Sequence, residues 1–344
     1  MKAALFDAPG IIRVDEVAQP TIEQPGDAVV RVTLSAIGGG DVAAYAGTTT
    51  PHRPAGGIGQ EFVGVVESVG DGVSRFKVGE RVVVPYCISC GGCFYCKQGL
   101  QSLCDSVQTY GVDLPGAQAE YVRVPNADSM LERLPDALTD TQAIFLAHLL
   151  SGPYAGFVDA GMQAGESVVV IGSGATGLSA QLLARTMGAG TLIAIDHHDD
   201  RLAVAGELGA VPLKLDGDAL ISTVQSFTGG RGADIVVEAV GSALALSQAV
   251  DLVRVSGRVL SLGTGIQDTA NYPIGRLAAK HARFIPGGRP SVKNHMPTLS
   301  RMIARGVLDP SPLVSHTLPL SDAPRAYELL KLRQDRAIKV LLTP

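Results

Sequence analysis

Residues 167–196 read SVVVIGSGATGLSAQLLARTMGAGTLIAID, and this stretch largely fixes the architecture of the middle of the chain. It opens with a short run of branched apolar residues that is typical of a buried strand. The run ends directly on GSGATG (172–177), and a helical pattern and a second apolar run, TLIAID (191–196), come next. This order predicts a strand, a tight turn, a helix and a second strand.

The spacing of the three glycines fits the pyrophosphate of a dinucleotide. Gly172 makes the tight turn, Gly174 lets the backbone approach the phosphates, and Gly177 lets helix and strand pack closely. The helix N-terminus stabilises the phosphate charge. Asp196 ends the second strand, where its carboxylate can accept hydrogen bonds from both adenosine ribose hydroxyls and would repel a 2′-phosphate. We therefore expect NAD(H) rather than NADP(H), with Arg201 covering the adenine ring.

The alternation of apolar strands and helical segments extends well beyond this stretch. It begins near residue 146 and includes DIVVEAV (234–240) and GRVLSLG (257–263), which indicates βαβ units and a doubly wound parallel sheet. It stops after about residue 288, where two helical patterns precede a last strand. Residues 1 to about 145 instead contain short β-type runs punctuated by Gly and Pro, as in a compact, partly barrel-like domain. The fold class is therefore α/β with a second, β-rich domain.

The composition argues against several classes of protein. Of the 344 residues, 46% are apolar and 18% are charged, so a large core can be buried. A formal charge of −5 provides no basic field for nucleic acid. The chain reaches Asp7 before any apolar region of a signal peptide develops, and the uncharged stretch 167–184 suits a strand–turn–helix better than a membrane span. We expect a cytoplasmic protein that binds neither nucleic acid nor membranes.

The cysteines indicate one metal site. All five lie within 18 residues, at Cys87, Cys90, Cys93, Cys96 and Cys104. The last four read C-x2-C-x2-C-x7-C, a spacing that lets four thiolates surround one tetrahedral Zn²⁺, although a set that includes Cys87 stays open. No cysteine lies elsewhere to hold a second, chemically active zinc.

The cysteine lobe (about 87–104), followed by a dinucleotide fold, resembles the medium-chain, zinc-type alcohol dehydrogenases over essentially the full chain. Further matching pieces are G-x-E-F-x-G-x-V-x-x-V-G (59–70), VGERVVVPY (78–86), AQAEYVRVP (117–125), EAVG (238–241) and the terminal IKVLL. The resemblance implies a GroES-like catalytic domain formed by residues 1–145 and 288–344 around a Rossmann domain, residues 146–287. It also implies a homodimer or homotetramer.

The same resemblance implies roles for single residues. The nicotinamide is expected to meet Val240, Gly241 and Gly263, and the structural zinc falls on the four cysteines of the C-x2-C-x2-C-x7-C pattern.

The chain departs from these relatives at the catalytic zinc. The family ligands are the cysteine of C-G-x-D, the histidine of G-H-E and a residue just before the first Rossmann helix, and these positions hold Gly38, Gln60 and Ala147. The proton-passing Ser or Thr and the relay histidine fall at Gly40 and Ala43. Glycine and alanine side chains cannot bind a metal, and a neutral amide is a poor zinc ligand. We expect one structural Zn²⁺ per chain and no catalytic Zn²⁺.

Without a Lewis acid, reduction of a carbonyl needs a proton donor or a strong hydrogen bond. Gln60 and His148 are our candidate catalytic groups, because both fall at or beside lost ligand positions. Further donor candidates are Tyr45, His52 and Tyr110. Two alternatives stay open, a metal site rebuilt from His148, Glu61 and Asp41, and an inactive structural descendant.

These features favour an NAD(H)-dependent oxidoreductase that acts on an alcohol or carbonyl. The first alternative is zinc-independent reduction of a conjugated C=C bond, where the enolate spreads the charge and a hydrogen bond suffices. The second is a non-catalytic NAD(H)-binding redox sensor. The small residues 38–40 and Ala43 leave space where the metal is missing, which favours a bulky or cyclic substrate.

Overall fold

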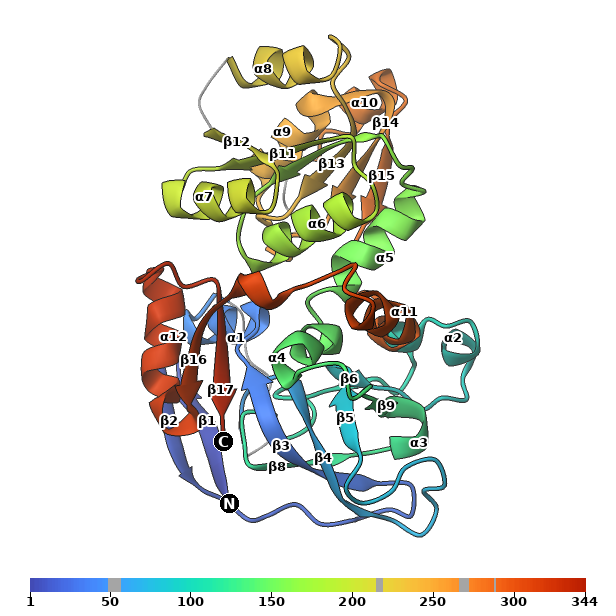
Figure 1. The fold of residues 1–344 in the computed structure, drawn as a ribbon, viewed down its shortest axis with the longest axis vertical. Helices are drawn as coiled ribbons and strands as arrows, with labels where there is room; N and C mark the ends of the chain where they lie inside the picture. The colour runs from blue at the N-terminus through green and yellow to red at the C-terminus, as the bar shows by residue number, and fades with distance from the viewer. Residues whose placement is uncertain (49–56, 215–218, 266–271, 288) are drawn as a thin grey trace. The chain divides into compact units, whose positions relative to one another are not determined.

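The chain divides into two compact units. The structure is a computed structural model that describes residues 1–48, 57–214, 219–265, 272–287 and 289–344. One unit comprises Met1–Ser151 with Ser291–Pro344, and the other comprises Gly152–Pro290 (Figure 1). The expected domain boundaries lay nearby in the sequence, at about residues 146 and 288.

The second unit contains a sheet of six parallel strands in the order β12-β11-β10-β13-β14-β15. The strands are β10 (Ser167–Ile171), β11 (Thr191–Asp196), β12 (Val211–Lys214), β13 (Ala233–Glu238), β14 (Val253–Ser261) and β15 (Arg283–Pro286). The strands β11 and β12 follow on one side of β10, and β13, β14 and β15 follow on its other side. The glycine-rich turn at the end of β10 therefore lies at the centre of the sheet, where the order of the strands changes side. This arrangement confirms the doubly wound α/β fold.

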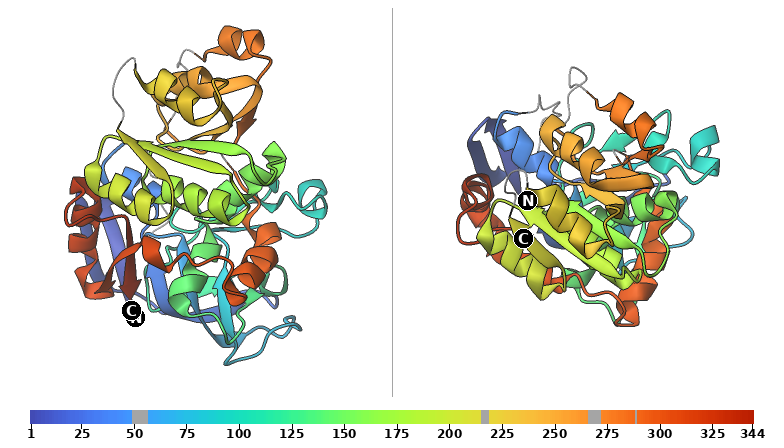
Figure 2. Two further views of the ribbon diagram at one scale, coloured as in Figure 1. Left: turned by 45° about the horizontal axis from the view of Figure 1, so that its top comes forward. Right: turned by 90° about the horizontal axis from the view of Figure 1, so that it is seen from above.

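Helices cover both faces of this sheet, which explains why its strands are almost continuously apolar. Figures 1 and 2 show α6 and α7 on one face and α8, α9 and α10 on the other. The helices of this part of the chain are α5 (Ser151–Ala160), α6 (Ala175–Thr186), α7 (Asp199–Glu207), α8 (Ala219–Phe227), α9 (Ala243–Leu252) and α10 (Ile274–Ala279). The core between α8, α9 and the sheet includes Val169, Ile193, Val236 and Leu246, all buried.

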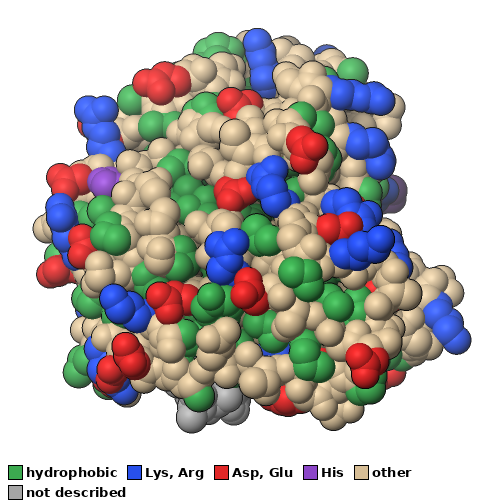
Figure 3. Space-filling view, turned by 60° about the horizontal axis from the view of Figure 1, so that its bottom comes forward, with side chains coloured by type: hydrophobic (Ala, Val, Ile, Leu, Met, Phe, Trp, Pro, Cys, Tyr) green, Lys and Arg blue, Asp and Glu red, His purple; other side chains and the backbone are tan. Residues whose placement is uncertain are grey.

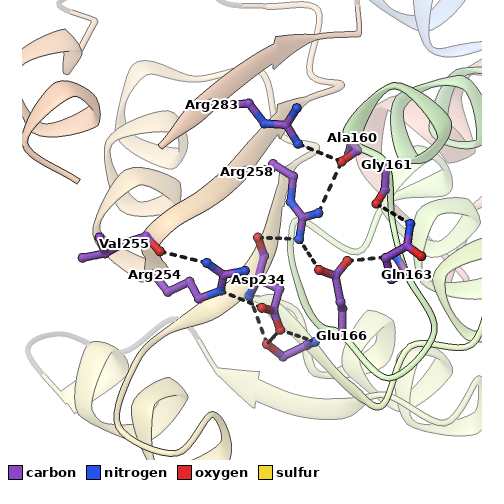
Figure 4. Close-up of polar contacts among 10 residues, drawn as sticks. Ala160, Gly161, Gln163, Glu166, Asp234, Arg254, Val255, Arg258 and Arg283 are labelled. Carbon is purple, nitrogen blue, oxygen red and sulfur yellow. Dashed lines mark hydrogen bonds and ion pairs between the residues drawn. The ribbon is translucent and has the colours of Figure 1, made fainter. Parts of the chain in front are cut away.

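Charged side chains tie the first residues of three strands of this sheet together (Figure 4). Arg258 donates to Glu166 at 2.5 Å. Asp234 accepts hydrogen bonds from the backbone N–H of Ser167 at 2.8 Å, from its hydroxyl at 2.7 Å, and from Arg254 Nε at 2.6 Å. Burial alone would raise the pKa of Asp234, but the Ser167 hydrogen bonds and the Arg254 charge outweigh it and lower the pKa to about 2.

Asp234→Asn is expected to weaken stability at neutral pH more than in acid. Because its folded pKa lies below the ordinary value, the carboxylate stabilises the fold fully above about pH 5 and loses this contribution as the pH falls toward 2. The lowering of the Asp234 pKa corresponds to about 2 kcal/mol of folding stability. Solvent screens this contribution only weakly, because the side chain is 25% exposed. Denaturant unfolding at about pH 7, where the contribution is complete, and at about pH 3.5, near the middle of the range over which it is lost, measures the difference. The exposed Asp159→Asn is the control, and equal losses at both pH values would contradict the assignment.

The first unit is built around a seven-stranded sheet to which both ends of the chain contribute. β17 pairs with β3 antiparallel, with Leu341 opposite Ala36, so the last strand lies beside an early one (Figure 1). The strands of this sheet are β3 (Ala28–Ala36), β4 (Glu61–Val69), β5 (Arg81–Val84), β8 (Tyr121–Val124), β9 (Glu132–Arg133), β16 (Val314–Pro319) and β17 (Lys339–Thr343). This β-rich body, to which both ends of the chain contribute, agrees with the second, β-rich domain that the sequence predicted.

Two small antiparallel strand pairs and several helices complete this unit. β1 (Lys2–Ala8) and β2 (Ile11–Glu16) form a hairpin, and β6 (Cys87–Ile88) pairs antiparallel with β7 (Gln108–Thr109) across a longer connection. The α-helices are α1 (Gly39–Tyr45), α2 (Phe94–Lys97), α3 (Ala127–Met130), α4 (Asp140–Ala143), α11 (Val292–Ala304) and α12 (Ala323–Leu332). Short 3₁₀ turns are η1 (Gln101–Leu103), η2 (Ile144–Ala147), η3 (Ser311–Leu313) and η4 (Leu320–Asp322).

The molecular face in Figure 3 carries Lys and Arg side chains among Asp and Glu side chains. Within the described residues, no single helix is long and apolar enough to cross a membrane. One pair of consecutive helical segments, 140–147 and 151–160, which are bent relative to each other, meets the test by length and composition when taken together.

Candidate functional site

The glycine-rich turn has the geometry that its spacing predicts. Gly172 has a φ of 92°, in the left-handed region. A Cβ on Gly177 would lie 1.7 Å from the carbonyl oxygen of Gly172, so no larger residue fits there. Gly174 precedes α6, no side chain caps this helix, and the nearest atom to a Cβ on Gly174 would be Arg201 Nη1 at 3.8 Å. The first backbone N–H groups of α6 are therefore available to an anion.

Asp196 is buried at the end of β11, beside this turn. Its Oδ2 accepts from the Ser173 N–H at 2.6 Å, and its Oδ1 accepts from the N–H groups of His197 and His198 at 2.7 and 2.9 Å. A carboxylate offers about four acceptor positions, so about one is left for a ribose hydroxyl. Asp196 thus holds the glycine-rich turn in place in addition to any contact with a ligand.

The segments expected to meet the nicotinamide are also held by a carboxylate. Glu238 is fully buried at the end of β13, and its Oε1 accepts from the N–H groups of Val240 and Gly241 at 2.8 and 2.6 Å. Gly241 has a φ of 83°, and a Cβ on Gly263 would lie 2.1 Å from the nitrogen of Gly241. The two segments therefore pack at backbone distance and exclude larger side chains.

Four cysteine side chains converge in the lobe between β6 and β7. The Sγ atoms of Cys90, Cys93, Cys96 and Cys104 all lie within 4.8 Å of one another, and Cys87 is outside this group. The Cys93–Cys96 and Cys90–Cys96 sulfur separations are 3.5 and 4.0 Å. Tetrahedral zinc with Zn–S bonds of about 2.3 Å requires sulfurs about 3.8 Å apart. The donor set and its spacing therefore fit one Zn²⁺.

The positions of the family's catalytic ligands lie in the first unit. Gly38 precedes α1, and its N–H donates to Asp41 Oδ2 at 2.8 Å. A Cβ on Gly38 would lie 3.1 Å from Glu61 Oε1 and 3.4 Å from Asp41 Oδ2. Gln60 is half-buried directly before β4, and Ala147 is fully buried at the end of η2. At Gly38, carboxylate oxygens thus lie close to where a metal-binding side chain would begin.

A lysine compensates one of these two carboxylates. Glu61 is 1% exposed, and its Oε2 accepts from Lys339 Nζ at 2.8 Å. Lys339 is 2% exposed and also donates to the Ile37 carbonyl at 3.0 Å. Burial would raise the pKa of Glu61, but the charge of Lys339 and the contact with His148 outweigh it and lower the pKa to about 2. Burial raises the pKa of Asp41 to about 7, and the hydrogen bond from the Gly38 N–H and the charge of Lys339 offset only part of this rise.

His148 lies against this pair. Its Nδ1 is 3.7 Å from Glu61 Oε1, whereas Lys339 binds the other carboxylate oxygen, Oε2. The imidazole packs on the ring of Tyr86 with centroids 4.4 Å apart and planes 33° apart. Its side chain is 36% exposed, whereas Glu61 is buried. The structure therefore brings one of the two predicted catalytic groups into contact with a buried anion.

The other donor candidates are less accessible. Tyr45 is buried and packs on the ring of Tyr327 at 5.3 Å. Tyr110 is fully buried, and its hydroxyl donates to the Arg123 carbonyl at 3.3 Å. His52 lies outside the described residues.

A rebuilt metal site receives no support from the geometry. Among the residues that the structure describes, only the four-cysteine group brings three or more ligand atoms within metal range, so Asp41, Glu61 and His148 do not form a second group.

Comparison with known proteins identifies the architecture. Residues 24–136 match the "Alcohol dehydrogenase GroES-like domain", and residues 175–305 match "Zinc-binding dehydrogenase". The "Uncharacterized zinc-type alcohol dehydrogenase-like protein AdhB" of Bacillus subtilis (strain 168) is 32% identical over 382 residues, covering 100% of both chains. The chain belongs to the medium-chain, zinc-type alcohol dehydrogenase family.

Solved structures agree with this assignment. Alcohol dehydrogenase TADH from Thermus sp. ATN1 superimposes on this medium-chain dehydrogenase with a TM-score of 0.95 and 38% identity, covering 100% of this chain and 99% of the other. A structure titled "NAD-dependent alcohol dehydrogenase" superimposes with a TM-score of 0.86 and 28% identity, covering 100% of both chains. This medium-chain dehydrogenase is therefore an oxidoreductase.

Sequence reasoning missed three residues of this medium-chain dehydrogenase that organise the site. Lys339 is a lone charge in the apolar run IKVLL, and Glu238 is a lone charge in IVVEAV (235–240). A charge inside a buried-strand pattern indicates a buried, partnered group, so both could have been noticed. Tyr86 gives no such local indication, because an aromatic residue at a strand end is common.

Proposed function

We propose that this dehydrogenase transfers a hydride between NAD(H) and an alcohol or carbonyl substrate without a catalytic zinc. The observation that carries the proposal is the set of residues at the ligand positions. Gly38 and Ala147 have no donor atom in their side chains, and Gln60 offers only a neutral amide. Beside them the ammonium of Lys339 is the cation that compensates Glu61.

The proposed cofactor is NAD(H), which supplies or accepts the hydride when bound. Gly172, Gly174 and Gly177 would receive the pyrophosphate at the start of α6, in the open space over Gly174. Asp196 would accept from the adenosine ribose and disfavour a 2′-phosphate, and Arg201 would cover the adenine ring. Contacts with the nicotinamide are proposed for Val240, Gly241 and Gly263, whose backbones pack closely.

One structural Zn²⁺ per chain is proposed for the cysteine lobe. The four ligands would be Cys90, Cys93, Cys96 and Cys104. Such a site has no open coordination position, since all four ligands are protein thiolates. Its role would be to stabilise the fold of the lobe rather than to take part in the reaction.

Two side chains are proposed to act on the substrate oxygen. The Gln60 amide can donate a neutral hydrogen bond from the former ligand position, and its Nε2 lies 3.8 Å from the Cβ position of Gly40. His148 can exchange a proton with the substrate, since its imidazole is partly exposed and a histidine side chain can both donate and accept a proton. A hydrogen bond and a proton donor together replace part of what a Lewis acid would supply.

Reduction of a conjugated C=C bond is the second candidate function. The proton-passing residue and the relay histidine of the family are replaced by Gly40 and Ala43, so the pathway that serves an alkoxide is missing. An enolate spreads its charge and needs less assistance. A non-catalytic NAD(H) sensor is the third candidate, and it would bind the cofactor without turnover.

The remaining proposals concern substrate and setting. Small residues at 38–40 and at Ala43 favour a bulky or cyclic small molecule. We propose a homodimer or homotetramer in the cytoplasm, with no nucleic-acid or membrane partner.

The proposed function predicts the product formed when the protein reduces a cyclic conjugated enone with NADH. Chromatography against both standards is expected to show the allylic alcohol, because Gln60 and His148 act on the oxygen. A saturated ketone would overturn this first proposal in favour of C=C reduction. No product, with NADH bound tightly, would overturn both and favour the sensor.

A further inference from the structure

The buried ion pair fixes which oxygen of Glu61 is free. Lys339 binds Oε2 at 2.8 Å and donates a second hydrogen bond to the Ile37 carbonyl at 3.0 Å. Oε1 is turned toward Gly38 and His148. Gly38 has no side chain to cover it, and the imidazole of His148 approaches Oε1 to 3.7 Å.

The imidazole is held in an orientation that suits this oxygen. Stacking on Tyr86 restricts rotation of the ring, and Nδ1 is the nitrogen nearest to Glu61. Because Nδ1 faces a carboxylate, it carries the proton in the neutral ring, and Nε2 is left with its lone pair. The group that faces one ring nitrogen of a histidine decides in this way which of the two nitrogens carries the proton.

We propose that Lys339 and Glu61 are positioning residues that fix the tautomer of His148 and present its Nε2 to the substrate oxygen. This inference rests on the proposed function, in which His148 exchanges the substrate proton. Within the described residues, other charged or titratable groups near the imidazole include Asp41 on α1 and Tyr86 after β5. Neither occupies the position that Glu61 takes beside Nδ1.

The proton balance of the step is simple. In the reducing direction the substrate carbon gains a hydride from NADH, and the carbonyl oxygen takes the Nε2 proton of the imidazolium. The C=O π electrons become the new O–H bond, and His148 remains neutral with its proton on Nδ1. Solvent then returns a proton to Nε2. Oxidation of an alcohol runs the same steps backward, with Nε2 as the acceptor.

The test replaces both members of the ion pair with apolar side chains, as Glu61→Met with Lys339→Met. The double change avoids leaving one charge buried alone. The matched control is Glu132→Met with Lys293→Met, another ion pair of the same unit, 2.8 Å apart. In protein labelled with ¹⁵N-histidine, the His148 signal is identified by its loss in His148→Gln, and its chemical shifts report the tautomer.

The expected result is the Nδ1–H tautomer in the wild type and in the control, and loss of that preference in the Glu61/Lys339 variant. The kcat of that variant should fall on the order of tenfold to a hundredfold, with little change in KM or in NADH affinity. An unchanged His148 spectrum would overturn the positioning role. If His148→Gln turned over as fast as the wild type, the proton step would be overturned even with the expected tautomer, and the fault would lie in the proposed function.

Discussion

Lys339→Met is expected to lower the free energy of unfolding by about 3–5 kcal/mol, because it leaves the Glu61 carboxylate buried without its cation. Asp41, also buried and close to the same position of Gly38, adds to the cost when ionised. The methionine has a similar length and no charge, so packing changes little. Denaturant unfolding at pH 7.5, followed by circular dichroism, measures the loss.

The double variant Glu61→Met/Lys339→Met separates the charge effect from a packing effect. Replacing both members of a buried pair with apolar groups of similar size is often nearly neutral, so the double variant should recover most of the stability. The surface pair of Lys214 and Asp199 offers a matched comparison, since Lys214→Met should cost no more than about 1 kcal/mol. A double variant as unstable as Lys339→Met alone would show that the lysine acts through packing.

Cys104→Ser is expected to remove the zinc of the cysteine lobe. Serine oxygen is a poor replacement for a thiolate, and a site with three remaining ligands should release the ion on dialysis. Since metal binding contributes directly to the folding of small metal-pinned segments, the lobe between β6 and β7 should open. Metal analysis should show zinc falling from about one per chain to nearly none, and limited proteolysis should cut within residues 87–104.

Cys87→Ser is the control for this experiment. Cys87 is buried but lies outside the four-sulfur group, so the variant should keep its zinc even if its stability declines. Zinc lost from Cys87→Ser and retained by Cys104→Ser would contradict the assigned ligand set.

The parallel sheet could be predicted because its evidence is local. The run TLIAID coincides with β11, and the strand before the glycine-rich turn coincides with β10, since each element and the turn after it are encoded in adjacent residues. The expectation of a doubly wound sheet needed only the order of these units. The same locality explains why the cysteine cluster could be predicted, since its four thiols lie within one short segment of the sequence.

The charge cluster could not be predicted in this way. Lys339 and Glu61 are 278 residues apart in the sequence, and their contact depends on β17 and β4 flanking the same strand, β3. The sequence suggested His148 as a catalytic group but not what orients it. Asp196 shows a related limit, because its residue type predicts a ribose contact while its three backbone partners depend on the conformation of the turn.

The most direct test of zinc-free hydride transfer is the metal content of the active, purified protein, combined with its turnover after chelation. We predict one zinc per chain, assigned to the cysteine lobe, and NADH-dependent reduction that survives a chelator treatment sufficient to strip an open, three-ligand site. Two zincs per chain, with activity lost as the weaker one is removed and restored when it is returned, would contradict the account.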